Sequence, residues 1–181
     1  MHVNKTQVLC MDIHNFFPSI NINQVFEAFH CVGYTSDVAQ ALAQLCTHNA
    51  ILPQGAPTSP TLANIIFSPI DQQILNAIST KEITYTRYAD DLIFSSSHEL
   101  DFLIPLVSEI ISTNGFEINS NKTHLMKNPY RKMITGLIVT DTVKIPKYYK
   151  RKFNQELFYC EKYGVASHLK NCKTHKKVNF K

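Results

Sequence analysis

The feature that most constrains the fold is a pair of adjacent carboxylates between two strand-like runs. Residues 83–86 are β-branched or aromatic, and the apolar residues 92–94 follow Asp90 and Asp91. Two such runs around a short polar segment predict an antiparallel hairpin with the acids at its tip. Aspartate is also a common turn residue, so this segment alone favours an ordinary turn over a metal site. The remainder of the chain decides between these two interpretations.

The segments around this hairpin alternate between strand and helix patterns. We expect strands at 7–13 and 116–118, a β pair at 133–139 and 143–145, and helices at 23–31, 100–114 and 147–163. Ser36 is expected to cap a further helix, and Ser59, followed by Pro60, a long apolar helix with a kink at Pro69. Residues 52–60 hold three prolines and a glycine, which exclude a regular element there. This order predicts an α+β fold, an antiparallel sheet with helices packed on one face.

Size and cysteine content narrow the class of protein. The 181 residues are 44% apolar, enough for one core, and no apolar run approaches the roughly 18 residues of a membrane helix. The first 20 residues lack the pattern of a signal peptide. Five cysteines without a CxxC pair predict reduced thiols and a cytosolic protein. A zinc site would need Cys160, His168, Cys172 and His175, and their unusual spacing argues against it.

Charge is concentrated near the C-terminus. Residues 144–181 hold 11 of the 18 Lys and Arg but only 2 of the 14 Asp and Glu. A solvated helix with a frayed end explains this, and so does a surface that binds a polyanion. The aromatic residues interleaved with these charges suit packing and base stacking equally, so both interpretations stay open.

A third carboxylate, Asp12, stands at the end of the strand predicted at 7–13. A carboxylate in an apolar run is costly unless it is paired or bound to metal. If this strand neighbours the hairpin, Asp12, Asp90 and Asp91 converge. Such a cluster is what two-metal phosphoryl transfer requires, with cations about 4 Å apart. Mg²⁺ prefers these ligands, together with substrate phosphates and water.

Four segments, in this order and spacing, resemble the palm of reverse transcriptases. They are Met-Asp-Ile-His-Asn-Phe-Phe at 11–17, Leu-Pro-Gln-Gly-Ala-Pro-Thr-Ser-Pro at 52–60, Arg-Tyr-Ala-Asp-Asp at 87–91, and Gly-Phe-Glu-Ile-Asn at 115–119 with Lys122 and Thr123. Ile-Thr-Gly-Leu-Ile-Val at 134–139 resembles the segment that leads into the thumb. Residues 84–92 and the Thr-Gly-Leu segment are most similar to bacterial retron-type enzymes. The resemblance covers roughly residues 7–155.

The resemblance implies roles for the acidic site. Asp12 and Asp90 would bind two Mg²⁺ ions, with Mn²⁺ as an alternative, and Asp91 would support the metal site. The backbone carbonyl of Ile13 would complete the coordination. Lys122 matches the lysine proposed to protonate the pyrophosphate leaving group, although a lone surface lysine is the simpler interpretation.

The resemblance also implies a nucleotide pocket. Phe17 would clash with a ribose 2′-OH and so select deoxynucleotides, whereas the sequence by itself favours a core phenylalanine. Gln54 and Gly55 would line the pocket, because glycine lets the backbone approach the substrate closely. Tyr88 would pack by the primer terminus, and Arg87 would steady the hairpin or contact backbone phosphates.

Two domains are implied, a catalytic palm at 1–146 and a basic partial thumb or tail at 147–181. The fingers region of the family, which grips the triphosphate, has no counterpart before Asp12. We therefore expect a truncated form, with weak or no activity alone.

The implied function is RNA-templated DNA synthesis in the bacterial cytoplasm, on an RNA template with a DNA or RNA primer and dNTPs. A retron-type enzyme would also have a cognate non-coding RNA and an effector protein in antiphage defence. The alternatives are a fragment of a group II intron-type reverse transcriptase and a non-catalytic RNA-binding remnant. The intact Asp12, Asp90 and Asp91 argue against the remnant.

Overall fold

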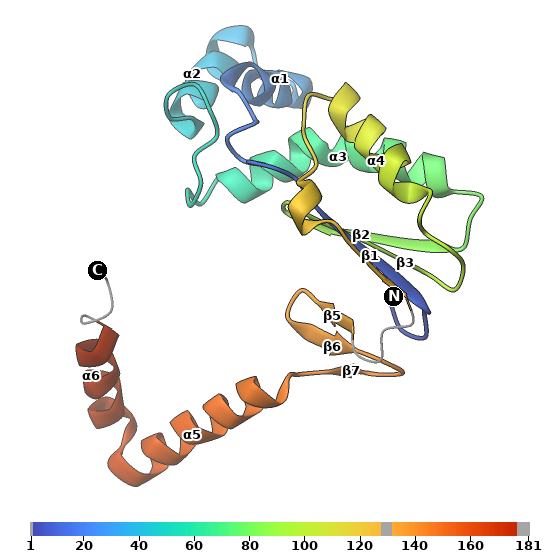
Figure 1. The fold of residues 1–181 in the computed structure, drawn as a ribbon. Helices are drawn as coiled ribbons and strands as arrows, with labels where there is room; N and C mark the ends of the chain where they lie inside the picture. The colour runs from blue at the N-terminus through green and yellow to red at the C-terminus, as the bar shows by residue number, and fades with distance from the viewer. Residues whose placement is uncertain (1, 128–131, 177–181) are drawn as a thin grey trace. The chain divides into compact units, whose positions relative to one another are not determined.

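A computed structural model describes the backbone of residues 2–127 and 132–176, and the side chains of residues 2–127 and 133–170. Contacts within the chain divide it into two units, residues 1–130 and residues 131–181, and each is described by itself (Figure 1). The boundary between these units differs from the domain boundary expected after residue 146. The functional division into palm and thumb stays a prediction.

The first unit contains a four-stranded antiparallel sheet. Its strands are β1 (Gln7–Asp12), β2 (Ile83–Tyr88), β3 (Asp91–Ser96) and β4 (His124–Lys127), in the order β2-β3-β1-β4. The predicted hairpin and the predicted first strand are confirmed. The strand expected at 116–118 is wrong, because only Ile118 pairs there, in a single bridge with Ile13. β4 takes its place at the sheet edge and was not predicted.

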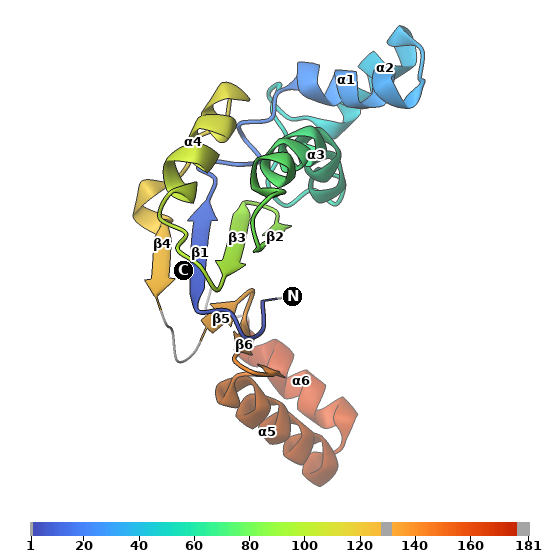
Figure 2. The same ribbon diagram turned by 90° about the vertical axis from the view of Figure 1, so that its right-hand side faces the viewer.

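Four helices complete this unit. They are α1 (Ile22–Val32), α2 (Ser36–Cys46), α3 (Ser59–Ile78) and α4 (Leu103–Thr113). Figure 2 shows α3 and α4 on the same side of the sheet. The predicted α+β class, an antiparallel sheet with helices on one face, is therefore confirmed.

The core lies between the sheet and these helices. Alternate residues of β1 and β3, among them Met11 and Phe94, point into one cluster with Phe67 of α3 and Ile111 of α4. All four side chains are at most 1% exposed. Each such side chain contributes about 1.5–3 kcal/mol by leaving water. The alternation of core-cluster residues along β1 and β3 therefore shows which face of the sheet the helices cover.

Both predicted helix caps were wrong by one residue. Thr35 and Thr58 occupy the N-cap positions, so that Ser36 and Ser59 are the first helical residues. The hydroxyl of Ser59 instead donates to the Pro53 carbonyl, 2.6 Å away, and ties the proline-rich segment to the start of α3. Because Ser59 is fully buried, this bond satisfies a hydroxyl that water cannot reach.

The second unit consists of a small sheet and two helices. The sheet contains β5 (Lys132–Ile134), β6 (Leu137–Val139) and β7 (Val143–Lys144), followed by α5 (Lys147–Tyr163) and α6 (Val165–Lys176). The expected pairing of residues 133–139 with residues 143–145 is confirmed, because β6 pairs with β7, but residues 133–139 do not form one continuous strand. Thr135 and Gly136 have φ of 44° and 81°, so they form a two-residue turn that folds the segment into a hairpin. The helix predicted at 147–163 is confirmed.

Two predictions concern membrane helices and cysteines, and the described residues allow each to be compared with the structure. Within these residues, no helix combines the length and apolar character that crossing a membrane requires. Cys10, Cys31, Cys46 and Cys160 are free thiols, as predicted. The side chains of Cys172 and His175, named for a zinc site, lie outside the described residues.

Candidate functional site

The acidic residues of two sequence motifs meet at one end of the sheet. Antiparallel pairing of β1 with β3 places Asp12 opposite Asp91. One residue further, the Ile13 amide donates to the Asp90 carbonyl at 3.0 Å. Because the N–H and C=O of an extended residue point to the same side, the Ile13 carbonyl also faces the turn that carries Asp90. The register thus brings together the three acids and the Ile13 carbonyl.

The turn itself is short and strained. Tyr88 pairs with Asp91, which leaves only Ala89 and Asp90 between β2 and β3. Ala89 has a φ of 51°, a conformation that residues with a Cβ rarely adopt. A two-residue turn of this kind places the Asp90 carboxylate at the very tip of the hairpin.

Lys122 is held against Asp12. Its Nζ lies 3.0 Å from Oδ2 of Asp12, which is only 7% exposed. The Asn119 amide donates to the Asp12 carbonyl at 2.8 Å, and a single 3₁₀ turn, Ser120–Lys122, follows. The backbone bond to Asp12 therefore sets the position from which the lysine reaches the carboxylate.

The charges of this cluster influence one another. Burial raises the pKa of Asp91, and the neighbouring Asp90 and Asp12 carboxylates raise it further, while Lys122 opposes them. The hydrogen bond to Asp12 raises the pKa of Lys122. The raised pKa values of Asp91 and Lys122 are what we expect for a group of carboxylates that a single ammonium group, that of Lys122, only partly neutralises.

We expect Asp91→Asn to raise the midpoint of thermal unfolding by a few degrees at neutral pH in EDTA. The folded chain raises the pKa of Asp91 above its unfolded value, so the ionised carboxylate destabilises the fold at any pH above the raised pKa. The gain should be full near pH 7 and shrink as the pH falls through the folded pKa toward the unfolded one. Calorimetry between about pH 4 and pH 8 measures this effect.

The matched control is Asp101→Asn, because Asp101 forms an exposed pair with Lys127 at 3.0 Å. This substitution should lower the midpoint slightly or leave it unchanged. A midpoint of Asp91→Asn equal to or below that of the unsubstituted chain at pH 7 would contradict the repulsion described above.

A pocket of about 260 Å³ lies beside the acidic cluster. It is lined by most of the residues expected to act on the substrate, namely Asp12, Ile13, Phe17, Gln54, Asp90 and Lys122. Asp91 lies opposite Asp12 in the sheet but does not line this pocket, and neither does Gly55, the neighbour of Gln54. Gly55 has a φ of 91°, so it serves the turn of the proline-rich segment.

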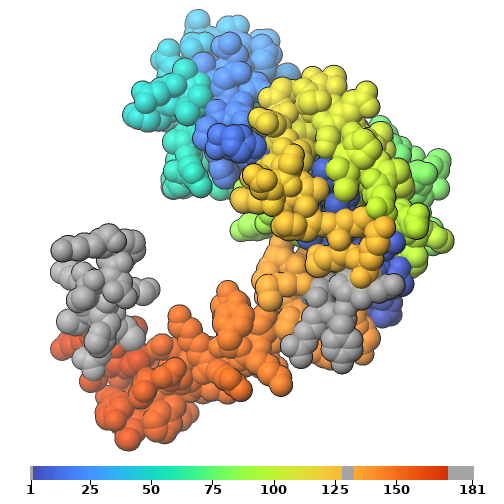
Figure 3. Space-filling view, viewed as in Figure 1, coloured from blue at the N-terminus to red at the C-terminus, as the bar shows by residue number. Residues whose placement is uncertain are grey.

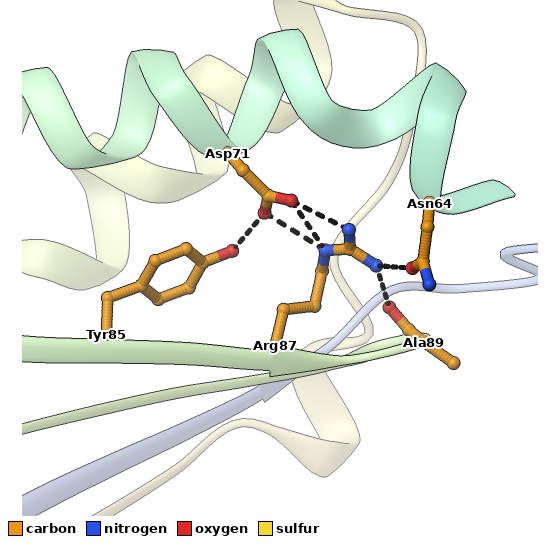
Figure 4. A network of polar contacts seen from close by, with 5 residues as sticks. All are labelled: Asn64, Asp71, Tyr85, Arg87 and Ala89. Atoms are coloured by element: carbon orange, nitrogen blue, oxygen red, sulfur yellow. Dashed lines mark hydrogen bonds and ion pairs between the residues drawn. The ribbon is translucent and has the colours of Figure 1, made fainter. Parts of the chain in front are cut away.

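A second pocket, of about 330 Å³, is lined by residues 87–89 of the hairpin and by residues of α3. Phe17 lines both pockets and so stands between them, and Tyr88, which is 72% exposed, lines the second. Arg87 also lines it, but the guanidinium is bonded to Asp71, to Asn64 and to the Ala89 carbonyl (Figure 4). These contacts correspond to the hairpin-steadying role considered for Arg87.

Asp71 is the residue of this region that sequence reasoning missed. It is the only charged residue of helix α3, so the reasoning that singled out Asp12, that a carboxylate near a core needs a partner, applies to it as well. No motif contains it, so only the contact with Arg87 connects it to the site.

The donor set suits a hard divalent cation. The described residues hold no ready-made group of three His, Cys, Asp or Glu side chains that could bind a metal. Mg²⁺ does not need one, because it binds through one or two carboxylates together with substrate phosphates and water. The repulsion among Asp12, Asp90 and Asp91 is what such a cation would relieve. The residues present therefore fit a magnesium or manganese site.

Sequence comparisons identify similar proteins over most of the chain. The sequence model of a family described as reverse transcriptase (RNA-dependent DNA polymerase) matches residues 2–163. The chain is 33% identical over 178 residues to the retron Ec86 reverse transcriptase of Escherichia coli, covering 93% of this chain and 54% of that protein. It is 31% identical over 166 residues to the retron Mx65 reverse transcriptase of Myxococcus xanthus, covering 81% and 39%. The chain thus spans about half or less of these relatives.

Solved structures show the same fold. Apo telomerase from Candida tropicalis, truncated from the C-terminal domain, superimposes with a TM-score of 0.58 at 16% identity. The match covers 77% of this chain and 35% of the telomerase chain. The likeness supports the architecture of strands and helices described above.

Proposed function

The chain belongs to the reverse transcriptase family, and from this premise we propose that it is the catalytic palm of an RNA-templated DNA polymerase. In this proposal a primer 3′-oxygen attacks the α-phosphate of a dNTP paired with an RNA template. The observation that carries the proposal is the strand register, which sets Asp12 opposite Asp91 and bonds Ile13 to Asp90. This register gathers acids from two distant motifs beside a pocket with Gln54.

The residues that would hold two Mg²⁺ or Mn²⁺ ions are Asp12, Asp90 and the carbonyl of Ile13, with Asp91 in support. Such ions supply activation of the attacking oxygen and stabilisation of the leaving oxygen. The protein provides positioning and fixed charge, which dominate phosphoryl transfer.

Lys122 Nζ is proposed to donate a proton to the pyrophosphate leaving group. Its raised pKa keeps it protonated at neutral pH, and it lines the same pocket as Asp90. The backbone near Gln54 and Gly55 is proposed to contact the incoming nucleotide, and the exposed Tyr88 to pack by the primer terminus.

Phe17 is proposed to exclude ribonucleotides, and its place between the two pockets supports this. We expect Phe17→Ala to lower the preference for dNTPs over rNTPs by roughly tenfold or more, because the clash with a 2′-OH is removed. The ratio of incorporation efficiencies for a matched dNTP and rNTP measures it. Phe17→Tyr, which keeps the bulk, should retain the preference; an unchanged ratio in Phe17→Ala would argue for a purely structural phenylalanine.

Template and primer are the proposed partners. The helix α5 has no buried residue and carries exposed Tyr148, Tyr149 and Phe153 among basic side chains. The space-filling view shows side chains projecting along this helix (Figure 3). Exposed aromatic and basic groups suit base stacking and phosphate contact.

The similarity to retron reverse transcriptases supports a retron-type over an intron-type enzyme. On the strength of this similarity the proposal also includes a cognate non-coding RNA and an effector protein. It places the chain in antiphage defence in the bacterial cytoplasm.

The test is single-turnover incorporation of one labelled dNTP onto a primed RNA template, with the chain in excess. Incorporation should require Mg²⁺ or Mn²⁺ and the dNTP that matches the template base. Binding of the primed RNA without metal-dependent incorporation would fit both a non-catalytic RNA-binding remnant and the truncated form expected above. Metal-dependent binding of the matched dNTP separates these two, because a remnant would not show it.

A further inference from the structure

A polar cluster joins α3 to the hairpin that carries Asp90 and Asp91 (Figure 4). Asp71 of α3 accepts hydrogen bonds from the Tyr85 hydroxyl at 2.7 Å and from Arg87 Nη2 and Nε at 2.7 and 3.0 Å. The bonds to Arg87 use both oxygens of the carboxylate, a paired geometry that fixes the guanidinium plane. Both partners of Asp71 lie on β2, the strand that leads into the turn.

The remaining edge of the guanidinium reaches the turn itself. Arg87 Nη1 donates to the Ala89 carbonyl at 3.2 Å and to Asn64 Oδ1 at 2.9 Å. The Arg87 side chain is only 8% exposed, and its guanidinium lies 4.6 Å from the centre of the Phe67 ring. The cation is therefore enclosed on one face by a buried aromatic ring and along its edges by protein acceptors.

Asp71 neutralises this enclosed cation. An enclosed charge without a partner is costly, and Asp71 is the carboxylate bonded to it. The burial of Tyr85 raises its pKa, and Asp71 raises it further, so the phenol stays protonated and donates to the acid. Asp71 thus keeps Arg87 in the orientation that reaches Ala89.

The contact with Ala89 supports a strained residue. The φ of 51° at Ala89 is held only if neighbouring contacts impose it. Asp90 follows directly, and its carbonyl accepts the Ile13 amide. A change in the orientation of Arg87 would therefore be transmitted to the turn and to its bond with β1.

We propose that Asp71 is a positioning residue that, through Arg87, holds the Ala89–Asp90 turn in register with β1. This inference rests on the proposed function for its catalytic consequence, but its structural consequence can be measured without activity. Because Asn64 and Asp71 lie on α3, which begins at the segment containing Gln54, one helix sets both the nucleotide segment and the acidic turn.

The experiment compares amide hydrogen exchange in the unsubstituted chain and in Asp71→Asn. The Ile13 amide, bonded to the Asp90 carbonyl, reports the turn, and the Leu9 amide in the same strand reports the sheet. We expect exchange at Ile13 to accelerate by about tenfold or more while Leu9 is unchanged. Equal acceleration at both positions, or at neither, overturns the proposal.

Two further variants separate positioning from stability. Tyr85→Phe removes a hydrogen bond to Asp71 but leaves Arg87 in place, so exchange at Ile13 should not change. Asp71→Glu keeps the charge and should restore part of the protection of the Ile13 amide that Asp71→Asn loses. If Asp71→Asn folds poorly, Asp71→Glu replaces it in the comparison with the unsubstituted chain. Failure of Asp71→Glu to protect Ile13 better than Asp71→Asn would contradict a charge-based role.

The catalytic arm measures single-turnover incorporation. Asp71→Asn should lower the maximal rate by about 10²-fold with little change in the dNTP concentration for half-maximal rate, since a small misplacement affects the chemical step. A loss confined to dNTP affinity opposes the proposal. If the unsubstituted chain neither incorporates a dNTP nor binds one in the presence of metal, the proposed function fails. The exchange result still decides whether Asp71 positions the turn.

Discussion

Replacing both acids of the turn, Asp90→Asn with Asp91→Asn, is expected to reduce dNTP incorporation about 10³-fold or more. Metal-bound charge supplies several kcal/mol of transition-state stabilisation, and each 1.36 kcal/mol corresponds to a factor of ten in rate. Asparagine keeps the size of the side chain but removes the negative charge that holds a hard cation. Single-turnover incorporation on primed RNA measures the loss.

This substitution separates chemistry from folding. Removing these charges should not destabilise the chain, because burial and the neighbouring carboxylates raise the pKa of Asp91. Thermal unfolding should therefore occur at an equal or higher temperature than in the unsubstituted chain. Asp101→Asn, which neutralises an exposed acid outside the site, should retain full incorporation. Substantial incorporation by the doubly substituted chain would refute the proposed two-metal site.

Phe67→Ala is expected to cost about 3–5 kcal/mol of folding free energy, the usual loss for a buried phenylalanine. Phe67 is fully buried, and its ring centre lies 5.5 Å from that of Phe16 and 5.3 Å from that of Phe116. It also forms the apolar wall beneath Arg87. Because a domain of this size has about 5–15 kcal/mol in total, this loss would leave a marginal fold.

Urea denaturation followed by circular dichroism measures this cost, from the shift of the midpoint at constant slope. Phe102→Ala is the matched control, because Phe102 is 40% exposed and Lys81 Nζ lies 4.7 Å from its ring centre. Its cost should be under about 1 kcal/mol. Equal costs at the two positions would show that Phe67 is not the centre of the core.

Local signals predicted most of the elements correctly. The hairpin at Asp90, the first strand and the basic helix at 147–163 depend on alternation or helical spacing within a few residues, and all three are confirmed. Errors arose where two short elements share one apolar run. Met133 to Val139 looks continuous, but the positive φ at Thr135 and Gly136 splits it. β4 was missed because its four residues carry too little pattern to stand out.

The sequence predicted which residues belong to the candidate site, but it did not predict the contacts among them. The Asp-Asp pair, the Leu-Pro-Gln-Gly segment and Lys122 were identified through resemblance to a family. The same information did not show that Lys122 reaches Asp12, at 3.0 Å, or that Gly55 lies outside the pocket lining. Their metal-binding and catalytic roles stay predictions that the experiments above test.

The sequence by itself determined the class of fold, the family and the acidic turn, because these depend on local pattern and on short motifs. Only the tertiary structure decided that β1 pairs with β3 so that Asp12 faces Asp91, and that Asp71 holds Arg87 against the turn. The physical reason is that both contacts join segments far apart in the chain. Their register depends on which faces are buried together, which no single segment specifies.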